Sequence, residues 1–190
     1  MVAMAYETVP VRPDGFTVDD LEEMPDDGRR YELIDGVLVV SPAARPRHQI
    51  AADRLGDVLK RASPPDLIVI PSPIDVERGP RTCLEPDLVV VRKADLDLDD
   101  AFRKTPVLVV EVVSPSSLDF DLGLKSRAYA RMGVPHYWVL HPRAHWVRVH
   151  ELDGDAYQLV AHAAGGETCE VERPFAVRFQ PGDLLAAFEP

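Results

Sequence analysis

The chain has 190 residues, 46% hydrophobic and 28% charged, with a formal net charge of −11 at pH 7, and these values suit one folded domain that buries a core. Its two cysteines, Cys83 and Cys169, form no C-x-x-C pair, which argues against a zinc knuckle or a disulfide scaffold and fits a reducing cytoplasm. The first residues lack the basic and apolar regions of a signal peptide, and the longest apolar run, 107–113, is too short to cross a bilayer, so we expect a cytoplasmic protein without membrane contact.

The first third of the chain predicts two helices and a hairpin. Residues 17–24 form a short helix, because a threonine can cap it and several acidic residues suit the positive end of its dipole. The Asp35-Gly36 pair is a strong turn signal between strands at 31–34 and 37–41. A proline then opens a helix over 46–62, where apolar residues recur at the helical period.

The middle of the chain predicts strands. Residues 67–70 and 74–77 form one strand that prolines interrupt, which is typical of a sheet edge or a bulge. Residues 88–91 and 107–113 are nearly continuous runs of valine and leucine. Such runs are typical of central strands that are covered on both faces.

The last part of the chain predicts a helix over 120–132, three strands and a proline-punctuated tail. The strands lie at 137–140, 146–152 and 157–160. The resulting order, αββαββ(β)αβββ, predicts an α/β protein of the α+β kind, with one mixed sheet and two helices packed on it. No linker marks a boundary, so we expect a single domain over residues 1–190.

Glu111 lies inside an apolar run, where a carboxylate loses much of its hydration at a cost of several kcal/mol if it stays unpaired. Such a group is paired, protonated or bound to a cation, and buried carboxylates of this kind cluster at functional sites. The alternative is a solvated residue at a strand end. We favour the functional interpretation.

Asp87 directly precedes the run at 88–91, and the next apolar run carries Glu111. Two neighbouring strands could therefore present their carboxylates side by side. Two close carboxylates repel each other unless a hard cation lies between them, and Mg²⁺ accepts one or two carboxylates with several waters. Taken alone, Asp87 would be interpreted as a turn residue at the start of a strand.

Lys125 lies on the helix that follows the Glu111 strand, four residues after Asp121. One interpretation is an ordinary ion pair between the two, worth a few tenths of a kcal/mol. The other is that the ammonium folds back over the strand, toward an attacking water or a scissile phosphate. Trp138 and Trp146 are interpreted as half-buried strand residues rather than as base-stacking platforms.

A series of motifs occurs between about residues 32 and 142 in an order that is specific, although each motif is weak alone. The motifs are YELIDG at 31–36, His48, EPD at 85–87, EVVSPSS at 111–117, Asp121-x-x-x-Lys125, Tyr129 and GVPHYW at 133–138. In this order they resemble the Uma-type family of restriction endonucleases, which belongs to the PD-(D/E)XK nuclease superfamily.

The resemblance implies a restriction-endonuclease-like αβββαβ core over about residues 30–142, with extra carboxyl-terminal strands over about 143–190. It implies an endonuclease that binds Mg²⁺, for which Mn²⁺ can substitute, and that acts on DNA. By matching position, Asp87 and Glu111 would be metal ligands and Lys125 the catalytic lysine. Glu32 and His48 match amino-terminal polar positions of the family with less defined roles.

The chain departs from the superfamily at two positions. The superfamily's lysine normally stands two residues after the glutamate, where this chain has Val113. A lysine supplied from the next helix, here Lys125, is a known variation. The YW motif usually continues to an aspartate before a proline, and here His141 occupies that position, which leaves its role open.

The charge distribution bears on the partner of the chain. Residues 1–35 carry 10 acids against 3 bases, whereas residues 125–150 carry 5 bases and no acid. Residues 36–63 carry 5 bases against 2 acids, so these two windows could form a basic patch for nucleic acid, or simply solvated faces. The rival hypothesis is a catalytically inactive binding module for nucleic acid or protein that keeps the nuclease fold. Because cutting both strands of a duplex needs two active sites, we also expect a symmetric homodimer, with 146–152 and 157–160 as the exposed candidates.

Overall fold

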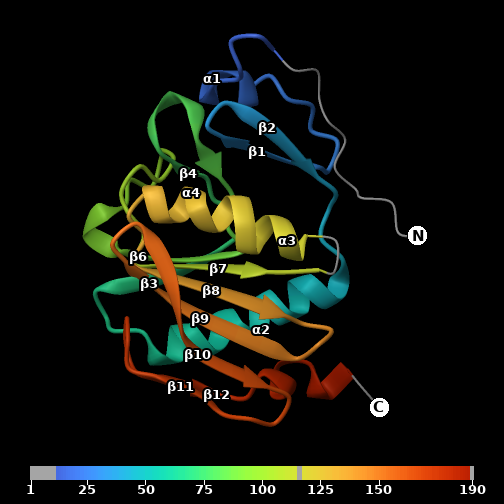
Figure 1. Cartoon of the computed structure of the whole chain (residues 1–190), viewed down its shortest axis with the longest axis vertical. Helices are drawn as coiled ribbons and strands as arrows, with labels where there is room; N and C mark the ends of the chain where they lie inside the picture. Colours follow the sequence, from blue (N-terminus) through green and yellow to red (C-terminus); the bar gives the residue numbers. More distant parts are fainter. Residues whose placement is uncertain (1–11, 115–116, 189–190) are drawn as a thin grey trace.

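The computed structural model describes residues 12–114 and 117–188, and it has a mixed α+β fold (Figure 1). Within these residues the strands form a six-stranded, a four-stranded and a two-stranded sheet. The mixed α+β class is therefore confirmed, whereas the expectation of one sheet is wrong. The predicted strands divide between the large and the small sheet: the hairpin at 30–41 lies in the small sheet, and the chain passes from the large sheet to the small one after residue 71.

The amino-terminal hairpin forms as predicted. Strand β1 (Arg30–Ile34) pairs with β2 (Val37–Ser41) in antiparallel register. Asp35 and Gly36 have φ angles of 52° and 83°, which is the left-handed pair that a two-residue hairpin turn requires. The preceding helix α1 (Val18–Leu21) is shorter than the predicted 17–24. Thr17 is its N-cap residue, as expected, and both its backbone N–H and its hydroxyl donate hydrogen bonds to the carboxylate of Asp20.

The small sheet has the order β2-β1-β5-β4. Strands β4 (Val76–Glu77) and β5 (Cys83–Leu84) flank a 3-10 turn, η1 (Gly79–Arg81). Strand β3 (Leu67–Pro71) belongs instead to the large sheet, so the prediction that 67–70 and 74–77 form one strand is wrong. The prolines at 71 and 73 cannot donate to a sheet ladder, and the chain crosses to the small sheet where they stand.

The large sheet has the order β10-β9-β8-β7-β6-β3, in which only the β7–β8 pair is parallel. Its remaining strands are β6 (Leu88–Arg92), β7 (Leu108–Val112), β8 (His136–His141), β9 (Trp146–Asp153) and β10 (Ala156–Ala164). Of the two alternatives for the segment at 67–70, a sheet edge or a bulge, β3 is a sheet edge. As predicted for a central strand, every residue of β7 is buried. Between β6 and β7 lies a second short 3-10 turn, η2 (Lys93–Asp95).

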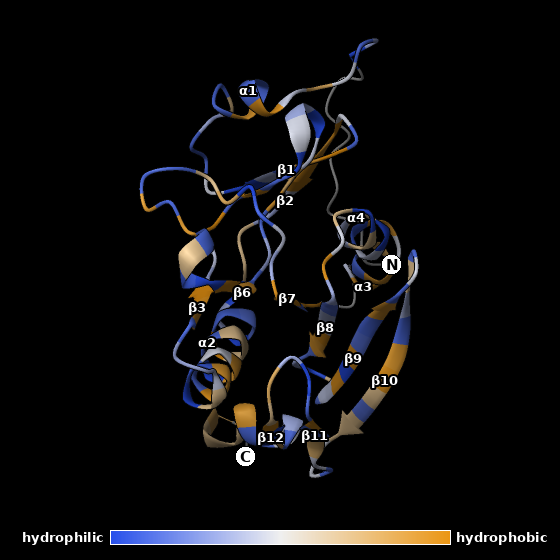
Figure 2. Ribbon diagram, turned by 90° about the vertical axis from the view of Figure 1, so that its left-hand side faces the viewer, coloured by the Kyte–Doolittle hydropathy of each residue, from blue (hydrophilic) through white to orange (hydrophobic). Residues whose placement is uncertain are grey.

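Helical segments cover both faces of the large sheet. Helix α2 (Pro46–Ala62) forms where it was predicted and packs on one face. The segment made of α3 (Leu118–Phe120), the π-helix η3 (Asp121–Lys125) and α4 (Ser126–Arg131) packs on the other, as Figures 1 and 2 show. Along β6, Leu88 and Val90 face α2, whereas Val89 and Val91 face α4.

The predicted helix over 120–132 is interrupted by this π-helix. The backbone N–H of Ser126 donates a hydrogen bond to the carbonyl of Asp121, five residues earlier. The hydroxyl of Tyr137 donates to the same carbonyl at 3.0 Å. Gly123 in the middle of the turn adds no side chain, and a hydroxyl that enters a helix ladder is a recognised cause of local unwinding. Such π turns are frequent at functional sites.

The tail after β10 is more regular than the sequence suggested. Strands β11 (Cys169–Val171) and β12 (Val177–Phe179) form the two-stranded sheet, and the 3-10 turns η4 (Pro181–Leu184) and η5 (Ala186–Phe188) follow. Phe179 and Leu184 pack into the same core as α2, so the tail closes that side of the large sheet. No helix in residues 12–114 or 117–188 is long and apolar enough to cross a membrane.

The homodimer stays a prediction, and the sheet order indicates which of the two candidate strands would form its interface. Strand β9 is paired on both sides, so β10 is the exposed edge, where Leu159 and Val160 are 54% and 49% exposed. An edge strand of this kind is a template for pairing with a second copy. We expect light scattering to find a dimer at tens of micromolar and a monomer for Leu159→Lys, while Leu98→Lys, at a 90% exposed loop position, stays dimeric. A monomeric wild type would contradict the prediction.

Candidate active site

The two predicted metal ligands lie opposite each other on neighbouring strands. Leu88 of β6 pairs with Val110 of β7, so the next step of this antiparallel ladder sets Asp87 against Glu111. Both side chains lie on the face of the sheet that α4 covers, and both are almost fully buried, at 3% and 2% exposed. The structure thus brings together the two carboxylates that the sequence singled out.

Asp87 is held by donors from three other segments. Its Oδ2 accepts the backbone N–H of Val112 at 2.7 Å and lies 3.1 Å from Nε2 of His48, in the first turn of α2. Its Oδ1 accepts both terminal nitrogens of Arg30 at 3.1 Å. Burial acts to raise the pKa of Asp87, but the hydrogen bond and charge of His48 and the charge of Arg30 outweigh it and hold that pKa at about 2.

Glu111 has a different environment. Its Oε1 accepts hydrogen bonds from Nζ of Lys125 at 3.1 Å and from the hydroxyl of Tyr129 at 2.8 Å. Burial raises the pKa of Glu111 well above its usual value; the charge of Lys125 opposes this rise and the charge of Asp87 adds to it. Of the two opposed carboxyl groups, Asp87 therefore keeps its negative charge more readily.

Lys125 occupies the position that the sharper interpretation of the sequence gave it. Its ammonium pairs with Glu32 at 2.8 Å and with Glu111 at 3.1 Å, rather than with Asp121, four residues earlier in the chain. Burial alone would lower the pKa of Lys125, but the charges of Glu111 and Glu32 raise it well above its usual value. The ordinary surface ion pair with Asp121 is therefore not what this lysine forms.

The two additional candidates, Glu32 and His48, also reach the cluster. Glu32 lies in β1, and its Oε1 accepts the backbone N–H of Glu85 at 2.9 Å besides pairing with Lys125. His48 contacts Asp87, while its Nδ1 is buried and has no hydrogen-bond partner. All five residues proposed from the sequence therefore lie in one cluster. They come from β1, α2, the residue before β6, β7 and η3.

Three further members of the cluster, Arg30, Glu85 and Tyr129, were not assigned to the site from the sequence, although Glu85 and Tyr129 lie in the family motifs. Arg30 binds Asp87 and also forms an ion pair through Nε with Glu85 at 3.0 Å. Oε1 of Glu85 in turn accepts a hydrogen bond from the hydroxyl of Ser72 at 2.7 Å. Tyr129 holds Glu111. Arg30 stands two residues before Glu32 on the same strand and Tyr129 four after Lys125 on a helical segment, and these spacings place side chains on one face. These spacings could have identified Arg30 and Tyr129, and the EPD motif at 85–87 already marked Glu85.

The donor set fits a divalent cation on the grounds of charge. The carboxylates are Glu32, Glu85, Asp87, Glu111 and Asp121, and the permanent cations are Arg30 and Lys125. Five formal negative charges against two positive ones leave a surplus of three, and a buried surplus of this sign favours a cation. Among the described residues no group of three or more His, Cys, Asp or Glu side chains is arranged to hold a metal ion. Two carboxylates completed by water remain sufficient for Mg²⁺.

His141, which stands where the family motif has an aspartate, is the last residue of β8, beside the turn to β9. Its Nδ1 accepts the backbone N–H of Ala144 at 3.1 Å, and its ring lies 5.2 Å from that of Trp146. Burial lowers the pKa of His141, although its backbone hydrogen bond opposes this. A neutral ring that accepts a backbone N–H is a turn-stabilising group, which accounts for this residue without a role in the cluster.

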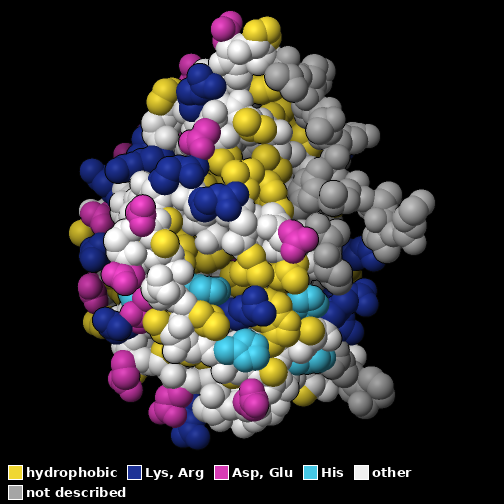
Figure 3. Space-filling view, in the orientation of Figure 1, with side chains coloured by type: hydrophobic (Ala, Val, Ile, Leu, Met, Phe, Trp, Pro, Cys, Tyr) yellow, Lys and Arg dark blue, Asp and Glu magenta, His cyan; other side chains and the backbone are white. Residues whose placement is uncertain are grey.

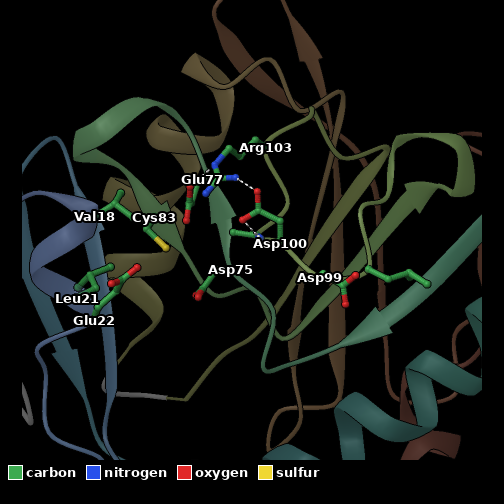
Figure 4. A pocket seen from close by; sticks show the side chains of 11 residues that line it. Val18, Leu21, Glu22, Asp75, Glu77, Cys83, Asp99, Asp100 and Arg103 are labelled. Carbon is green, nitrogen blue, oxygen red and sulfur yellow. Dashed lines mark hydrogen bonds and ion pairs between the residues drawn. The ribbon is translucent and has the colours of Figure 1, made fainter.

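A hollow of about 550 Å³ lies elsewhere, between α1, the small sheet and the loop at 98–103 (Figure 4). Acidic side chains line it, among them Glu22, Asp75 and Asp99. Its one basic residue, Arg103, is neutralised by Glu77 at 2.7 Å and by Asp100. None of the cluster residues lines this hollow, and its negative lining does not suit a phosphate.

A family model described as Uma2, putative restriction endonuclease, matches residues 18–187. The chain is also similar to the crystal structure of a putative nuclease belonging to DUF820 from Anabaena variabilis, with a TM-score of 0.71 and 17% identity over 90% of this chain and 98% of that one. At this identity the likeness concerns the fold alone. No curated protein matches the chain.

Asp121 makes the stability of the apoprotein depend on pH. Burial raises the pKa of Asp121 from 3.8 to about 6, although the charge of Lys125 and a hydrogen bond from Ser117 oppose the rise. A raised pKa stabilises the fold fully below about pH 4, and this contribution is lost as the pH rises through 6. At about 1.4 kcal/mol per pKa unit, we expect Asp121→Asn to be more stable than wild type at pH 7 by up to about 3 kcal/mol, and equally stable near pH 4.

Urea unfolding in the presence of a chelator measures this difference. The matched control is Asp53→Asn, on the exposed side of α2, for which the difference from wild type should be the same at both pH values. A gap for Asp121→Asn that does not change between pH 4 and pH 7 would contradict the assignment.

Proposed function

Because the chain belongs to the Uma2 family, described as putative restriction endonuclease, we propose that it is a metal-dependent endonuclease that hydrolyses phosphodiester bonds in DNA. The observation that carries this proposal is the buried cluster in which Asp87 and Glu111 oppose each other and Lys125 lies against Glu111. Such a group of coupled charges is costly to bury, so it favours a functional role over a purely structural one.

The order of elements supports a restriction-endonuclease-like core. Helix α2, strands β3, β6 and β7, the α3–α4 segment and strand β8 occur in the αβββαβ order that the family resemblance implies, with β4 and β5 of the small sheet inserted between β3 and β6. They span residues 46–141, within the expected core of 30–142. Strands β9 to β12 then correspond to the carboxyl-terminal extension at 143–190.

Asp87 and Glu111 would hold Mg²⁺, for which Mn²⁺ can substitute, with water completing the coordination. When bound, such an ion activates water and neutralises charge that develops on a phosphate. The surplus of negative charge in the cluster supports this assignment. The two carboxyl groups differ in the ease with which they ionise, since the pKa of Asp87 is about 2 and that of Glu111 is raised.

The remaining side chains would position the reacting groups and stabilise the negative charge that develops on the phosphate. Lys125 holds an ammonium beside Glu111, where it can orient a water molecule and stabilise negative charge on a phosphate oxygen. Glu32 fixes the direction of that ammonium through its 2.8 Å contact. Tyr129 donates to Glu111 and thereby keeps one carboxylate oxygen in place.

A specific observation favours the second candidate, a catalytically inactive binding module. Asp87 already contacts Arg30 and His48, and Glu111 contacts Lys125, so side chains of the chain itself occupy the space around both proposed ligands. The net charge of −11 and the valine at 113 point in the same direction. Metal binding separates the two candidates, because an inactive module has no need to bind Mg²⁺ or Mn²⁺.

Metal binding is tested first with Asp87→Asn and Glu111→Gln. We expect Mg²⁺ and Mn²⁺ to raise the melting temperature of the wild type and of a surface control, Glu170→Gln, but not that of either variant. Without metal, Asp87→Asn should be less stable than wild type at pH 7, because a carboxyl whose pKa is lowered stabilises the fold when charged. Glu111→Gln should be as stable as wild type or more so. Retention of the full metal-induced shift by both variants would refute the ligand assignment.

The role of Lys125 is tested by nicking of supercoiled plasmid with Mn²⁺. We expect Lys125→Ala to lose activity by roughly 100-fold or more while it still binds metal, and the exposed Lys60→Ala to stay active. Removing a buried charge also costs about 3–5 kcal/mol, so the comparison is made where circular dichroism shows every variant folded.

Val113 offers a rescue of that variant. It is buried on the same face as Glu111, as predicted, so Val113→Lys in the Lys125→Ala background should return part of the activity. A fully active Lys125→Ala protein would contradict the catalytic assignment.

A further inference from the structure

A second cluster of aromatic and basic side chains lies apart from the buried carboxylates, on strands β8 to β10. The guanidinium of Arg148 lies 4.7 Å from the centre of the Trp146 ring. The rings of His141 and His162 lie 5.2 and 6.3 Å from the same indole. Figure 3 shows histidine side chains gathered with a basic side chain on this face of the sheet, below α4.

The register of the sheet relates this cluster to the carboxylates. Glu111 of β7 pairs with Val139 of β8, Val139 with Arg148 of β9, and Arg148 with His162 of β10. Residues in one such row point to the same face of a sheet, and neighbouring strands lie about 4.8 Å apart. Arg148 therefore stands roughly 10 Å from Glu111 on the same face.

The end of the sheet connects the two sites. Val139 is fully buried, so a ligand cannot run straight along the row from Glu111 to Arg148. One step further along, His141 pairs with Trp146 at the end of β8, and β7 ends beside it because these two strands are parallel. A ligand would reach the cluster over this end of the sheet.

The charges of the cluster suit a polyanion. Trp146 and Arg148 are partly exposed and His162 is exposed. Within the described part of the chain no carboxylate lies within 4.0 Å of the Arg148 guanidinium, in contrast to Arg30, Arg103 and Arg131. The sequence window 125–150 contains 5 bases and no acid, and Arg148 is the base of that window that lies in this cluster. The attraction between a guanidinium and an indole, about 0.5–1 kcal/mol at an exposed site, holds the charge of Arg148 in place.

We propose that Trp146, Arg148 and His162 bind a single strand of nucleic acid that extends from the Asp87–Glu111 site. Bases stack on aromatic rings and on guanidinium planes, and basic side chains neutralise phosphates. This proposal rests on the proposed function for the class of its ligand. It adds a binding role to Trp146, which is a half-buried strand residue as the sequence predicted.

The test is binding without metal, so it does not depend on cleavage. The chain has two tryptophans, and Trp138 is fully buried, so quenching of tryptophan fluorescence reports on Trp146. We titrate the wild type with a 15-mer of oligothymidylate in the presence of a chelator. We expect quenching on binding, and fluorescence anisotropy of the labelled 15-mer gives the affinity independently.

Arg148→Gln and His162→Gln are the test variants, and Arg54→Gln, exposed on α2 at the opposite face of the sheet, is the matched control. We expect Arg148→Gln to weaken binding on the order of tenfold and to lower the slope of log affinity against log salt by about 0.7. His162→Gln should weaken binding less, and Arg54→Gln less than twofold.

The two proposals fail separately in this design. If the wild type binds and Arg148→Gln weakens that binding, the cluster proposal stands even when no variant ever nicks plasmid. If plasmid is nicked but the 15-mer neither quenches Trp146 nor responds to Arg148→Gln, the cluster proposal is overturned and the nuclease proposal stands. Quenching by a duplex alone, with no response to oligothymidylate, also overturns the single-strand assignment.

Discussion

The ammonium of Lys125 is the contact on which the arrangement of the cluster depends. It lies between Glu32 of the small sheet and Glu111 of the large sheet, and it comes from the helical segment that covers both. Each of these three groups is almost fully buried, so any one of them alone would cost several kcal/mol. Their mutual neutralisation allows three parts of the fold, far apart in sequence, to meet at one point.

The two opposed carboxyl groups have been given opposite environments by their neighbours. Asp87 receives a backbone N–H, a guanidinium and an imidazole, which together keep its pKa at about 2 despite burial. Glu111 receives one ammonium and one hydroxyl, and burial raises its pKa. The charge that Asp87 retains adds to the rise in the pKa of Glu111. The same asymmetry is what distinguishes the two variants proposed for metal binding.

Much of the secondary structure could be predicted because it rests on local chemistry. The hairpin at Asp35-Gly36 follows from a turn that only a few residue pairs adopt, and α2 follows from a proline start and a helical apolar period. The π turn at 121–125 could not be predicted, because its cause includes a hydroxyl from Tyr137, on a strand later in the chain. The division of 67–77 between two sheets likewise depends on which partner strands are present.

The sequence by itself determined which residue types carry the candidate chemistry. Three local patterns indicate it: Glu111 within an apolar run, Asp87 before the neighbouring run, and Lys125 on the next helix. These patterns can be interpreted from the sequence because burying an unpaired charge is costly. The tertiary structure alone decided their partners: Arg30 and His48 on Asp87, Tyr129 on Glu111, and Glu32 rather than Asp121 on Lys125. The physical reason is that hydrogen bonds and ion pairs act over about 3 Å, and only the packing of the two sheets and the helices around them brings segments this remote in sequence to that distance.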